Sequence, residues 1–346
     1  MSALDATGVG EHFVLGFRGT RLPEWLVEFE REFGLGGILL FDRDVESDAP
    51  LRNVESTAQL GELCAGVHAL ESRPLVFVDQ EGGRVRRLKP ERGFAELPSA
   101  AAFGKLGDER AREVVSESYL QMRACGIDFN LAPVVDLNSN PENPNIGALE
   151  RAYSAEPGEV RRCVRIVAAA ARESGIQLCL KHYPGLGGAR VDSHLELTDV
   201  TDTNPPAQEA LFVELLAEVP GGAILLSHAI DRARDPVWPA SVSEAQVRGV
   251  RGACPEALLI TDDVQMAGLR QLCGTSDAAL RALSVGVDWV CIGNNLEREE
   301  GESVEAADRV RREAALDGAL ETRLVESRIR IAEAKRRSRS GPLLVG

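Results

Sequence analysis

The sequence lacks an excess of basic residues and any apolar run long enough to cross a membrane. Its 346 residues include 54 acidic and 39 basic side chains, which gives a formal net charge of −15. Nucleic acids and anionic membranes favour a clustered basic face instead. A bilayer-spanning helix needs roughly 18 to 20 consecutive apolar residues, and no such stretch is present. We therefore expect neither a nucleic-acid nor a membrane partner.

Secretion signals and paired cysteines are also missing. The opening segment MSALDATGVGEHF has no basic region followed by an apolar one, so no secretory signal is visible. The 7 cysteines are odd in number, scattered and never spaced as CxxC, which is typical of reduced thiols in the cytosol. Hydrophobic residues form 44% of the chain, enough for a large core. These features predict a soluble, cytoplasmic, globular protein.

Short apolar runs of strand length recur along the chain, each followed by a longer segment. The runs cover residues 13–17, 37–41, 75–78, 128–132, 177–180, 223–226, 257–260 and 289–292. Between them, segments such as 111–122 and 160–173 carry apolar residues at the three- and four-residue spacing of a helix. Alternating strands and helices of this kind predict repeated βα units around a parallel sheet.

Polar side chains able to do chemistry follow the apolar runs. They are Arg18, Asp42, Asp79, Gln80, Glu81, Asp136, Lys181, His182, Ser227, His228, Asp262, Asp263, Asn294 and Asn295. In a (β/α)8 barrel the carboxyl ends of all strands meet on one face. A doubly wound sheet would also bind ligands at strand ends, but the phosphate-binding loops GxGxxG and GxxxxGK[ST] are absent. We predict an α/β fold, a single-domain (β/α)8 TIM-type barrel over residues 1–346 with a helical end at 300–346.

The segment KHYPGLGGARVDSH, residues 181–194, predicts a catalytic loop. Lys181 and His182 end a buried strand, and a glycine-rich turn follows. Asp192 and His194 are two residues apart, so the carboxylate can orient one ring nitrogen and leave the other for proton transfer. A structural role is the usual alternative for a single histidine, but its place in this loop favours proton transfer.

Two adjacent carboxylates, Asp262 and Asp263, end another strand in TDDVQM. Neighbouring strand side chains diverge, so we expect one of them to face the barrel mouth. Asp262 is the candidate, as nucleophile, general base or metal ligand, and Asp263 is the candidate helix N-cap. Asp79 in VDQEGGR suits hydrogen bonds to vicinal hydroxyls; the alternative is an ion pair with Arg84 or Arg86.

Together these segments resemble glycoside hydrolase family 3, and within it the bacterial β-N-acetylglucosaminidases of cell-wall recycling. The resemblance runs from about Phe13 to Asn295 and includes GFRGT, GGILLF, VDQEGGRV, LAPVVDLNSNPENPNIG, KHYPG with DSH, SH and TDDVQM. It implies a retaining β-N-acetylhexosaminidase that releases terminal β-linked N-acetylglucosamine from peptidoglycan fragments in the cytoplasm. It implies no metal and no cofactor.

The resemblance also implies residue roles. Asp262 matches the nucleophile, His194 the general acid/base and Asp192 its dyad partner. Asp262 would attack the anomeric carbon while His194 protonates the leaving oxygen, and water activated by His194 would then hydrolyse the glycosyl-aspartate. The sugar-binding groups of the family match Asp79, Arg151, Lys181 and His182.

Two departures from the family pattern concern the site. Leu186 stands where the pattern KHFPGHG has its second histidine, and Ala148 and Leu149 form an insertion able to displace Arg151.

Alternatives stay open from the sequence alone. A β-glucosidase or an N-acetylglucosaminide phosphorylase would use the same scaffold, and a non-catalytic carbohydrate-binding descendant would account for the departures. The residues also allow a Schiff-base lysine at Lys181, or a metal site from His182, His228 and Asp262. The aglycone and the oligomeric state stay open, a monomer included.

Overall fold

Within residues 8–191, 197–296 and 300–340, which the computed structural model describes, eight parallel strands close into a barrel. They follow the order β1-β10-β9-β8-β7-β6-β3-β2, so each barrel strand lies beside the next one along the chain. Their bounds are β1 Phe13–Gly16, β2 Gly37–Leu40, β3 Leu75–Val78, β6 Phe129–Asn130, β7 Gln177–Tyr183, β8 Ala223–Leu226, β9 Leu258–Asp263 and β10 Trp289–Ile292. Every apolar run of the sequence falls on one of these strands, and the predicted (β/α)8 barrel is confirmed.

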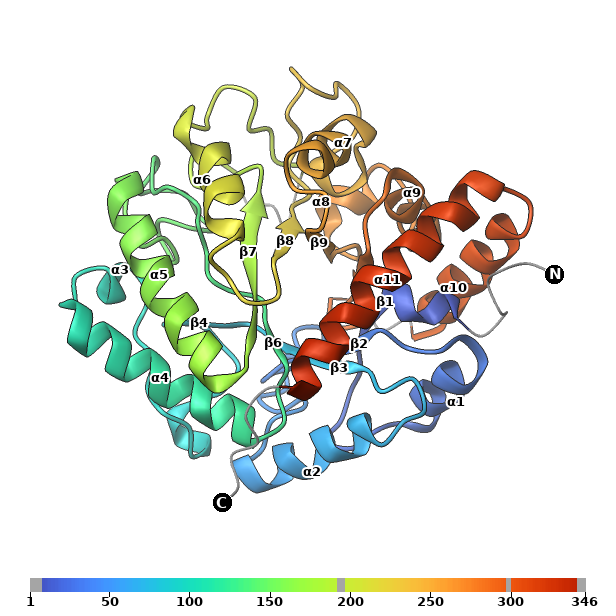
Figure 1. Cartoon of the computed structure of the whole chain (residues 1–346), viewed down its shortest axis with the longest axis horizontal. Coiled ribbons are helices and arrows are strands. Elements are labelled where there is room, and N and C mark those ends of the chain that lie inside the picture. Colours follow the sequence, from blue (N-terminus) through green and yellow to red (C-terminus); the bar gives the residue numbers. More distant parts are fainter. Residues whose placement is uncertain (1–7, 192–196, 297–299, 341–346) are drawn as a thin grey trace.

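Helices surround the barrel (Figure 1). The α-helices are α1 Glu24–Phe33, α2 Thr57–His68, α3 Ala100–Phe103, α4 Asp108–Ala124, α5 Pro157–Ser174, α6 Ala207–Leu216, α7 Glu244–Ala253, α8 Ala267–Arg270, α9 Thr275–Val285, α10 Glu300–Ala314 and α11 Gly318–Ser340. Short 3-10 helices are η1 Val9–His12, η2 Pro90–Arg92 and η3 Ala240–Val242. The predicted helical segments 111–122 and 160–173 lie inside α4 and α5. No helix among the described residues has the length and apolar character needed to cross a bilayer.

The strands separate two apolar layers. Along β9, Ile260 belongs to the cluster inside the barrel, whereas Leu259 belongs to the cluster between strands and helices, as the two-residue strand period requires. Inside the barrel, the rings of Phe77 and Phe129 stack with centroids 5.0 Å apart, and Trp289 lies edge-on to Phe77 at 5.3 Å. The interior is therefore a packed core, and a ligand can enter only beyond the strand ends.

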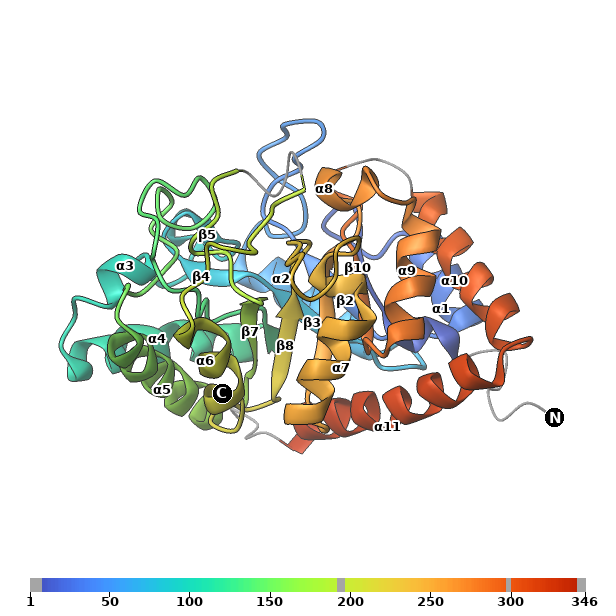
Figure 2. The ribbon, with the colours of Figure 1, turned by 90° about the horizontal axis from the view of Figure 1, so that it is seen from above.

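Helix α11 lies across the amino-terminal end of the barrel, opposite the loops that follow the strands (Figure 2). Its Ile331 and Ala334 belong to the inner cluster, and Gln177 at the start of β7 donates to the Ala334 carbonyl at 3.0 Å. Because this end is closed, the chemistry predicted for the strand ends must occur on the other side.

A short antiparallel hairpin, β4 (Gln80–Gly82) with β5 (Val85–Arg86), follows β3. Its residues are mostly polar and do not form an apolar run in the sequence. Gly82 and Gly83 have φ of 97° and 57°, and a Cβ on Gly82 would lie 2.1 Å from a backbone oxygen. Only glycine fits such a turn. The hairpin brings polar side chains back toward the barrel mouth.

Candidate active site

Asp79 and Lys181 form an ion pair at the carboxyl ends of β3 and β7. Each lies two residues beyond an inner-cluster side chain, Phe77 or Cys179, and so continues the inward face of its strand. The Lys181 Nζ lies 2.7 Å from Asp79 Oδ1. Burial by itself would raise the pKa of Asp79, but Lys181 and Arg87 hold it well below its ordinary range. Both groups are charged at neutral pH.

The expected alternative for Asp79, an ion pair with Arg84 or Arg86, is wrong in its partner. Arg87 Nη2 donates to Asp79 Oδ2 at 3.1 Å, whereas Arg86 pairs with Glu96 and Arg84 is exposed. Asp79 thus has one cation on each oxygen, and its side chain is still 14% exposed.

Glu81 joins Lys181 to Arg151. Its Oε1 accepts from Lys181 Nζ at 2.6 Å and from Arg151 Nη2 at 2.8 Å, and its Oε2 accepts from Arg151 Nε at 2.8 Å. Burial by itself would raise the pKa of Glu81, but Arg151 and Lys181 bring it to about 2. Burial would likewise lower the pKa of Lys181, yet Asp79 and Glu81 raise it. The three groups form a buried, fully ionised cluster.

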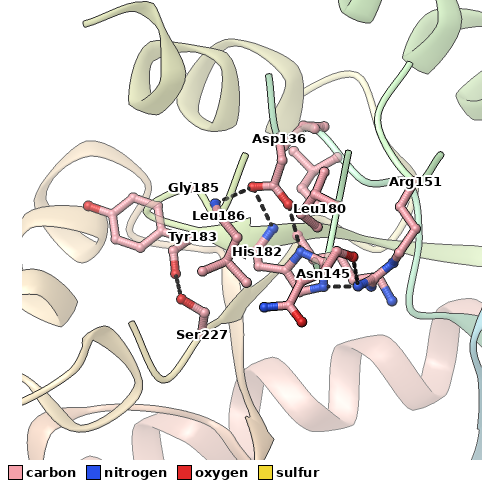
Figure 3. A network of polar contacts seen from close by, with 12 residues as sticks. Asp136, Asn145, Arg151, Leu180, His182, Tyr183, Gly185, Leu186 and Ser227 are labelled. Carbon is pink, nitrogen blue, oxygen red and sulfur yellow. Dashed lines mark hydrogen bonds and ion pairs between the residues drawn. The ribbon is translucent and has the colours of Figure 1, made fainter. Parts of the chain in front are cut away.

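His182 lies between Arg151 and Asp136 (Figure 3). Its Nδ1 is 2.7 Å from Asp136 Oδ2, and its Nε2 is 3.0 Å from Arg151 Nη2. A guanidinium can only donate, so Nε2 must accept and Nδ1 must carry the proton that it donates to the carboxylate. His182 thus holds Arg151 through Nε2, and Asp136 holds the ring through Nδ1.

The turn that holds the extra residues Ala148 and Leu149 leads directly into Arg151. The Arg151 N–H donates to the Ile146 carbonyl at 3.0 Å, and the Ala148 N–H donates to the Asn143 carbonyl at 2.9 Å. The extra residues are accommodated inside this turn, which returns the chain to the site. The structure thus brings Arg151 together with His182 despite the changed spacing.

Asp262 lies at the carboxyl end of β9, on the inward face two residues beyond Ile260. Its Oδ1 accepts from the Asp263 N–H at 2.9 Å. The strand before Asp79, β3, belongs to the same closed parallel barrel as β9. Asp262 and Asp79 therefore both lie at the carboxyl-terminal mouth of the barrel.

Asp263 is not the helix N-cap that we expected. Helix α8 begins at Ala267, and its N-cap is Met266, which makes no side-chain cap. Asp263 Oδ1 accepts instead from the N–H groups of Gln265 and Gly293, at 3.0 and 3.1 Å. Asp263 thereby connects the end of β9 to the end of β10. Its role is structural, but it caps no helix.

Asp192 and His194, the predicted dyad, lie outside the described residues. Val191, the last described residue before them, is held near Arg151, because Asn145 contacts both Val191 and Arg151. Asn145 Nδ2 donates to the Val191 carbonyl at 3.3 Å, and the Asn145 carbonyl accepts from Arg151 Nη1 at 2.9 Å.

Leu186 is buried, with 2% exposure, in a small apolar cluster with Val134, Ile146 and Ala152. Its backbone N–H donates to Asp136 Oδ1 at 2.8 Å. The loop is therefore attached to the site through its backbone, and a histidine side chain at this position is not needed for that contact.

The Schiff-base and metal alternatives do not fit these contacts. A Schiff-base lysine needs a lowered pKa, whereas Lys181 is kept as an ammonium by Asp79 and Glu81. Both ring nitrogens of His228 have protein partners, Ser241 Oγ at 2.7 Å and a backbone oxygen at 2.8 Å. In the described part of the chain, no three His, Cys, Asp or Glu side chains are arranged to hold a metal ion.

Three residues of the site received no role from the sequence: Glu81, Arg87 and Asp136. Glu81 is two residues beyond Asp79, so the strand period could have placed both on one face of an extended hairpin. Asp136 was visible only as a polar residue after a strand. Arg87 carries no comparable signal, because its contact with Asp79 depends on the hairpin.

The arrangement suits a ligand rich in hydroxyl groups. A hydroxyl both donates and accepts, so it can bridge a carboxylate such as Asp79 and an ammonium such as Lys181. Asp262, on a neighbouring part of the mouth, adds a carboxylate with one oxygen held by a backbone N–H.

Known proteins resemble this chain over most of its length. The family described as "Glycosyl hydrolase family 3 N terminal domain" matches residues 23–324. A β-hexosaminidase of Thioalkalivibrio sulfidiphilus is 34% identical over 298 residues, which cover 82% of this chain and 81% of that protein.

Solved structures give the same result. A family 3 β-N-acetylglucosaminidase from Paenibacillus sp. superimposes with a TM-score of 0.86 at 28% identity, over 99% of this chain and 65% of that one. This chain thus spans less than two thirds of the Paenibacillus protein. A β-N-acetylhexosaminidase from Beutenbergia cavernae gives a TM-score of 0.83 at 25% identity, over 97% of this chain and 100% of that one.

Proposed function

This chain belongs to glycosyl hydrolase family 3, and we propose that it is a retaining β-N-acetylhexosaminidase that releases terminal β-linked N-acetylglucosamine. As a member of the family it is a glycoside hydrolase. Relatives called β-hexosaminidase and similar structures called β-N-acetylglucosaminidase or β-N-acetylhexosaminidase support the acetamido sugar as substrate. They favour it over the β-glucosidase, phosphorylase and non-catalytic alternatives.

The observation that carries the proposal is the charged cluster of Asp79, Lys181, Glu81 and Arg151 at the mouth that also holds Asp262. In this proposal Asp79 accepts hydrogen bonds from sugar hydroxyls, and Lys181 and Arg151 donate to sugar oxygens. His182 contributes by orienting Arg151, because both of its ring nitrogens already have protein partners.

The proposed reaction has two steps. Asp262 Oδ2 attacks the anomeric carbon, while His194 gives its proton to the leaving glycosidic oxygen and the C–O bond breaks. His194 then takes a proton from water, and the resulting hydroxide displaces the aspartate from the anomeric carbon with net retention. Asp192 would keep the His194 imidazole in the correct orientation. The hydrogen bond from the Asp263 N–H to Asp262 Oδ1 supports attack through the other oxygen.

We further propose peptidoglycan fragments as the substrate class and the cytoplasm as the site of action. The scattered, unpaired cysteines support a reducing compartment. Lys181 and Arg151 offer cationic N–H donors at the mouth, although Asp79 and Glu81 pair with them. These local groups matter more for binding an anionic fragment than the net charge of −15.

The test is hydrolysis of 4-nitrophenyl N-acetyl-β-glucosaminide, with the matching β-glucoside and added phosphate as controls. We expect release of nitrophenol from the acetamido sugar, formation of free β-N-acetylglucosamine by NMR, and no dependence on phosphate. Asp262→Ala should abolish turnover. A folded wild-type protein that hydrolyses only the β-glucoside, or forms the sugar phosphate, would overturn the proposal.

A further inference from the structure

Glu81 is the one carboxylate among the described residues that contacts both Lys181 and Arg151. We propose that Glu81 is a positioning residue of this site, which holds these two cations as a fixed pair and does not itself contact the sugar. The inference rests on the proposed function, because it assigns Glu81 a part in binding the same substrate.

The hydrogen-bond geometry shows how Glu81 limits the two cations. Arg151 has five N–H donors, and four of them go to Glu81 Oε1 and Oε2, His182 Nε2 and the Asn145 carbonyl. Lys181 has three donors, and two go to Asp79 and Glu81. Within the described residues, each cation therefore keeps one N–H for a ligand, and Glu81 determines the direction of both.

Burial separates the part of Glu81 from that of Asp79. The Glu81 side chain is 3% exposed, whereas the Asp79 side chain is 14% exposed. Asp79 can thus reach a sugar hydroxyl while remaining paired. Glu81 is covered by the groups that it binds, and the low dielectric around it strengthens its hold on them.

Charge gives Glu81 a second effect on Lys181. Burial and the Arg151 guanidinium both lower the pKa of Lys181, whereas Asp79 and Glu81 raise it. Without the negative charge of Glu81, these two effects are opposed less strongly. Lys181 should then lose its proton at lower pH, while a guanidinium stays charged in any case.

The backbone that carries Glu81 is fixed independently of its side chain. The neighbouring Gln80 donates through Nε2 to the Leu88 carbonyl and accepts at Oε1 from the N–H groups of Arg87 and Leu88, all at 3.0 Å. The Gln80 N–H also donates to Asn130 Oδ1 at 2.9 Å. Replacement of the Glu81 side chain should therefore leave the hairpin in place.

The experiment compares Glu81→Gln, Glu81→Asp and a matched control, Asp288→Asn. Asp288 is also a buried carboxylate between two cations, Arg251 and Arg330, but it precedes β10 at the closed end of the barrel. The substrate is 2,4-dinitrophenyl N-acetyl-β-glucosaminide, whose leaving group needs little protonation. The pH dependence of its kcat/KM therefore does not depend on the general acid.

We expect Glu81→Gln to lower kcat/KM by about 100-fold, the scale of a small misplacement of binding groups, and to move the alkaline limb of the profile to lower pH. Glu81→Asp keeps the charge, so it should keep the wild-type limb with a smaller loss. Asp288→Asn should lose stability and keep the wild-type profile. A Glu81→Gln profile parallel to that of the wild type, or kcat/KM within threefold, would overturn the positioning role.

Binding of N-acetylglucosamine by calorimetry separates this inference from the proposed function. If the wild-type protein binds the sugar but hydrolyses nothing, the proposed function fails, and Glu81 is still tested by affinity. We expect at least a tenfold weaker affinity for Glu81→Gln. Equal affinities of the folded variant and the wild type would refute the role of Glu81 whatever the activity.

Discussion

Replacement of Asp136 by asparagine should disable the site without disrupting the barrel. Asp136 is fully buried, and its carboxylate accepts from His182 Nδ1 at 2.7 Å and from the Leu186 N–H at 2.8 Å. In Asp136→Asn the carbonyl can accept only one of these bonds well. If it keeps Leu186, the amide N–H2 faces His182 Nδ1, which must then give up its proton.

The displaced proton would move to His182 Nε2, which lies 3.0 Å from Arg151 Nη2. Two donors would then face each other, and Arg151 must turn away. The variant thus exchanges the charge-assisted bond of His182 Nδ1 for a neutral one and loses the bond of Arg151 to His182. At roughly 1.5 kcal/mol for each of these two changes, the loss in stability is about 3 kcal/mol. The misplaced Arg151 should lower kcat/KM by about 100-fold.

Three measurements test this reasoning: urea unfolding, kcat/KM on the nitrophenyl N-acetylglucosaminide, and the His182 tautomer by nitrogen-15 NMR. Asp128→Asn is the control, because Asp128 is also buried and accepts from a histidine, His68 Nε2 at 2.8 Å, and from a backbone N–H at 2.9 Å. It precedes β6, at the opposite end of the barrel. A wild-type His182 with its proton on Nε2, or an Asp136→Asn enzyme as active as Asp128→Asn, would refute the argument.

Three further predictions concern single side chains. Leu186→His should cost about 2 kcal/mol in stability, because it buries a polar ring in an apolar cluster, and should not raise activity; a fivefold gain in kcat/KM would contradict this. Asp262→Asn should lower kcat by more than about 1000-fold. Asp263→Asn should instead mainly lower the unfolding temperature. Equal losses of kcat in the two variants would show that the roles assigned to Asp262 and Asp263 are wrong. Burial lowers the pKa of His12 from 6.5 to about 4, so between these pH values the unfolded chain takes up a proton that the folded one refuses. Wild-type stability should therefore fall by up to about 3 kcal/mol more than that of His12→Gln as the pH drops from 6.5 to 4, which urea titrations at several pH values would detect or exclude.

The sequence predicted the barrel because its strands are buried on both faces. Runs such as 75–78, 223–226 and 289–292 match β3, β8 and β10 at both ends. Where a strand continues into polar residues, the apolar run is shorter than the strand. The run 177–180 ends before Lys181, whereas β7 extends through Lys181 and His182 to Tyr183. The β4–β5 hairpin was missed because its residues are polar and its turn depends on Gly82 and Gly83.

From residue patterns alone, without the family resemblance, the site was predictable where side chains follow from strand parity. Asp79, Lys181 and Asp262 each lie two residues beyond an inner-cluster position. The two-residue period of a strand therefore predicts that their side chains point to the inside of the barrel mouth. The ion pair of Glu81 with Arg151 joins residues 70 positions apart, and no local sequence pattern predicts it. The contacts of Arg151 were equally hidden, because the sequence does not show how a turn accommodates the two extra residues Ala148 and Leu149.

The central claim, a glycosyl-aspartate formed on Asp262, is tested most directly by trapping it. A 5-fluoro-N-acetylglucosaminyl fluoride should inactivate the enzyme with a single added sugar, and peptide mass spectrometry should find that sugar on Asp262. We expect this label on the wild-type enzyme and its loss in Asp262→Asn. A label on any other residue, with Asp262 unmodified in a fully inactivated enzyme, would contradict it.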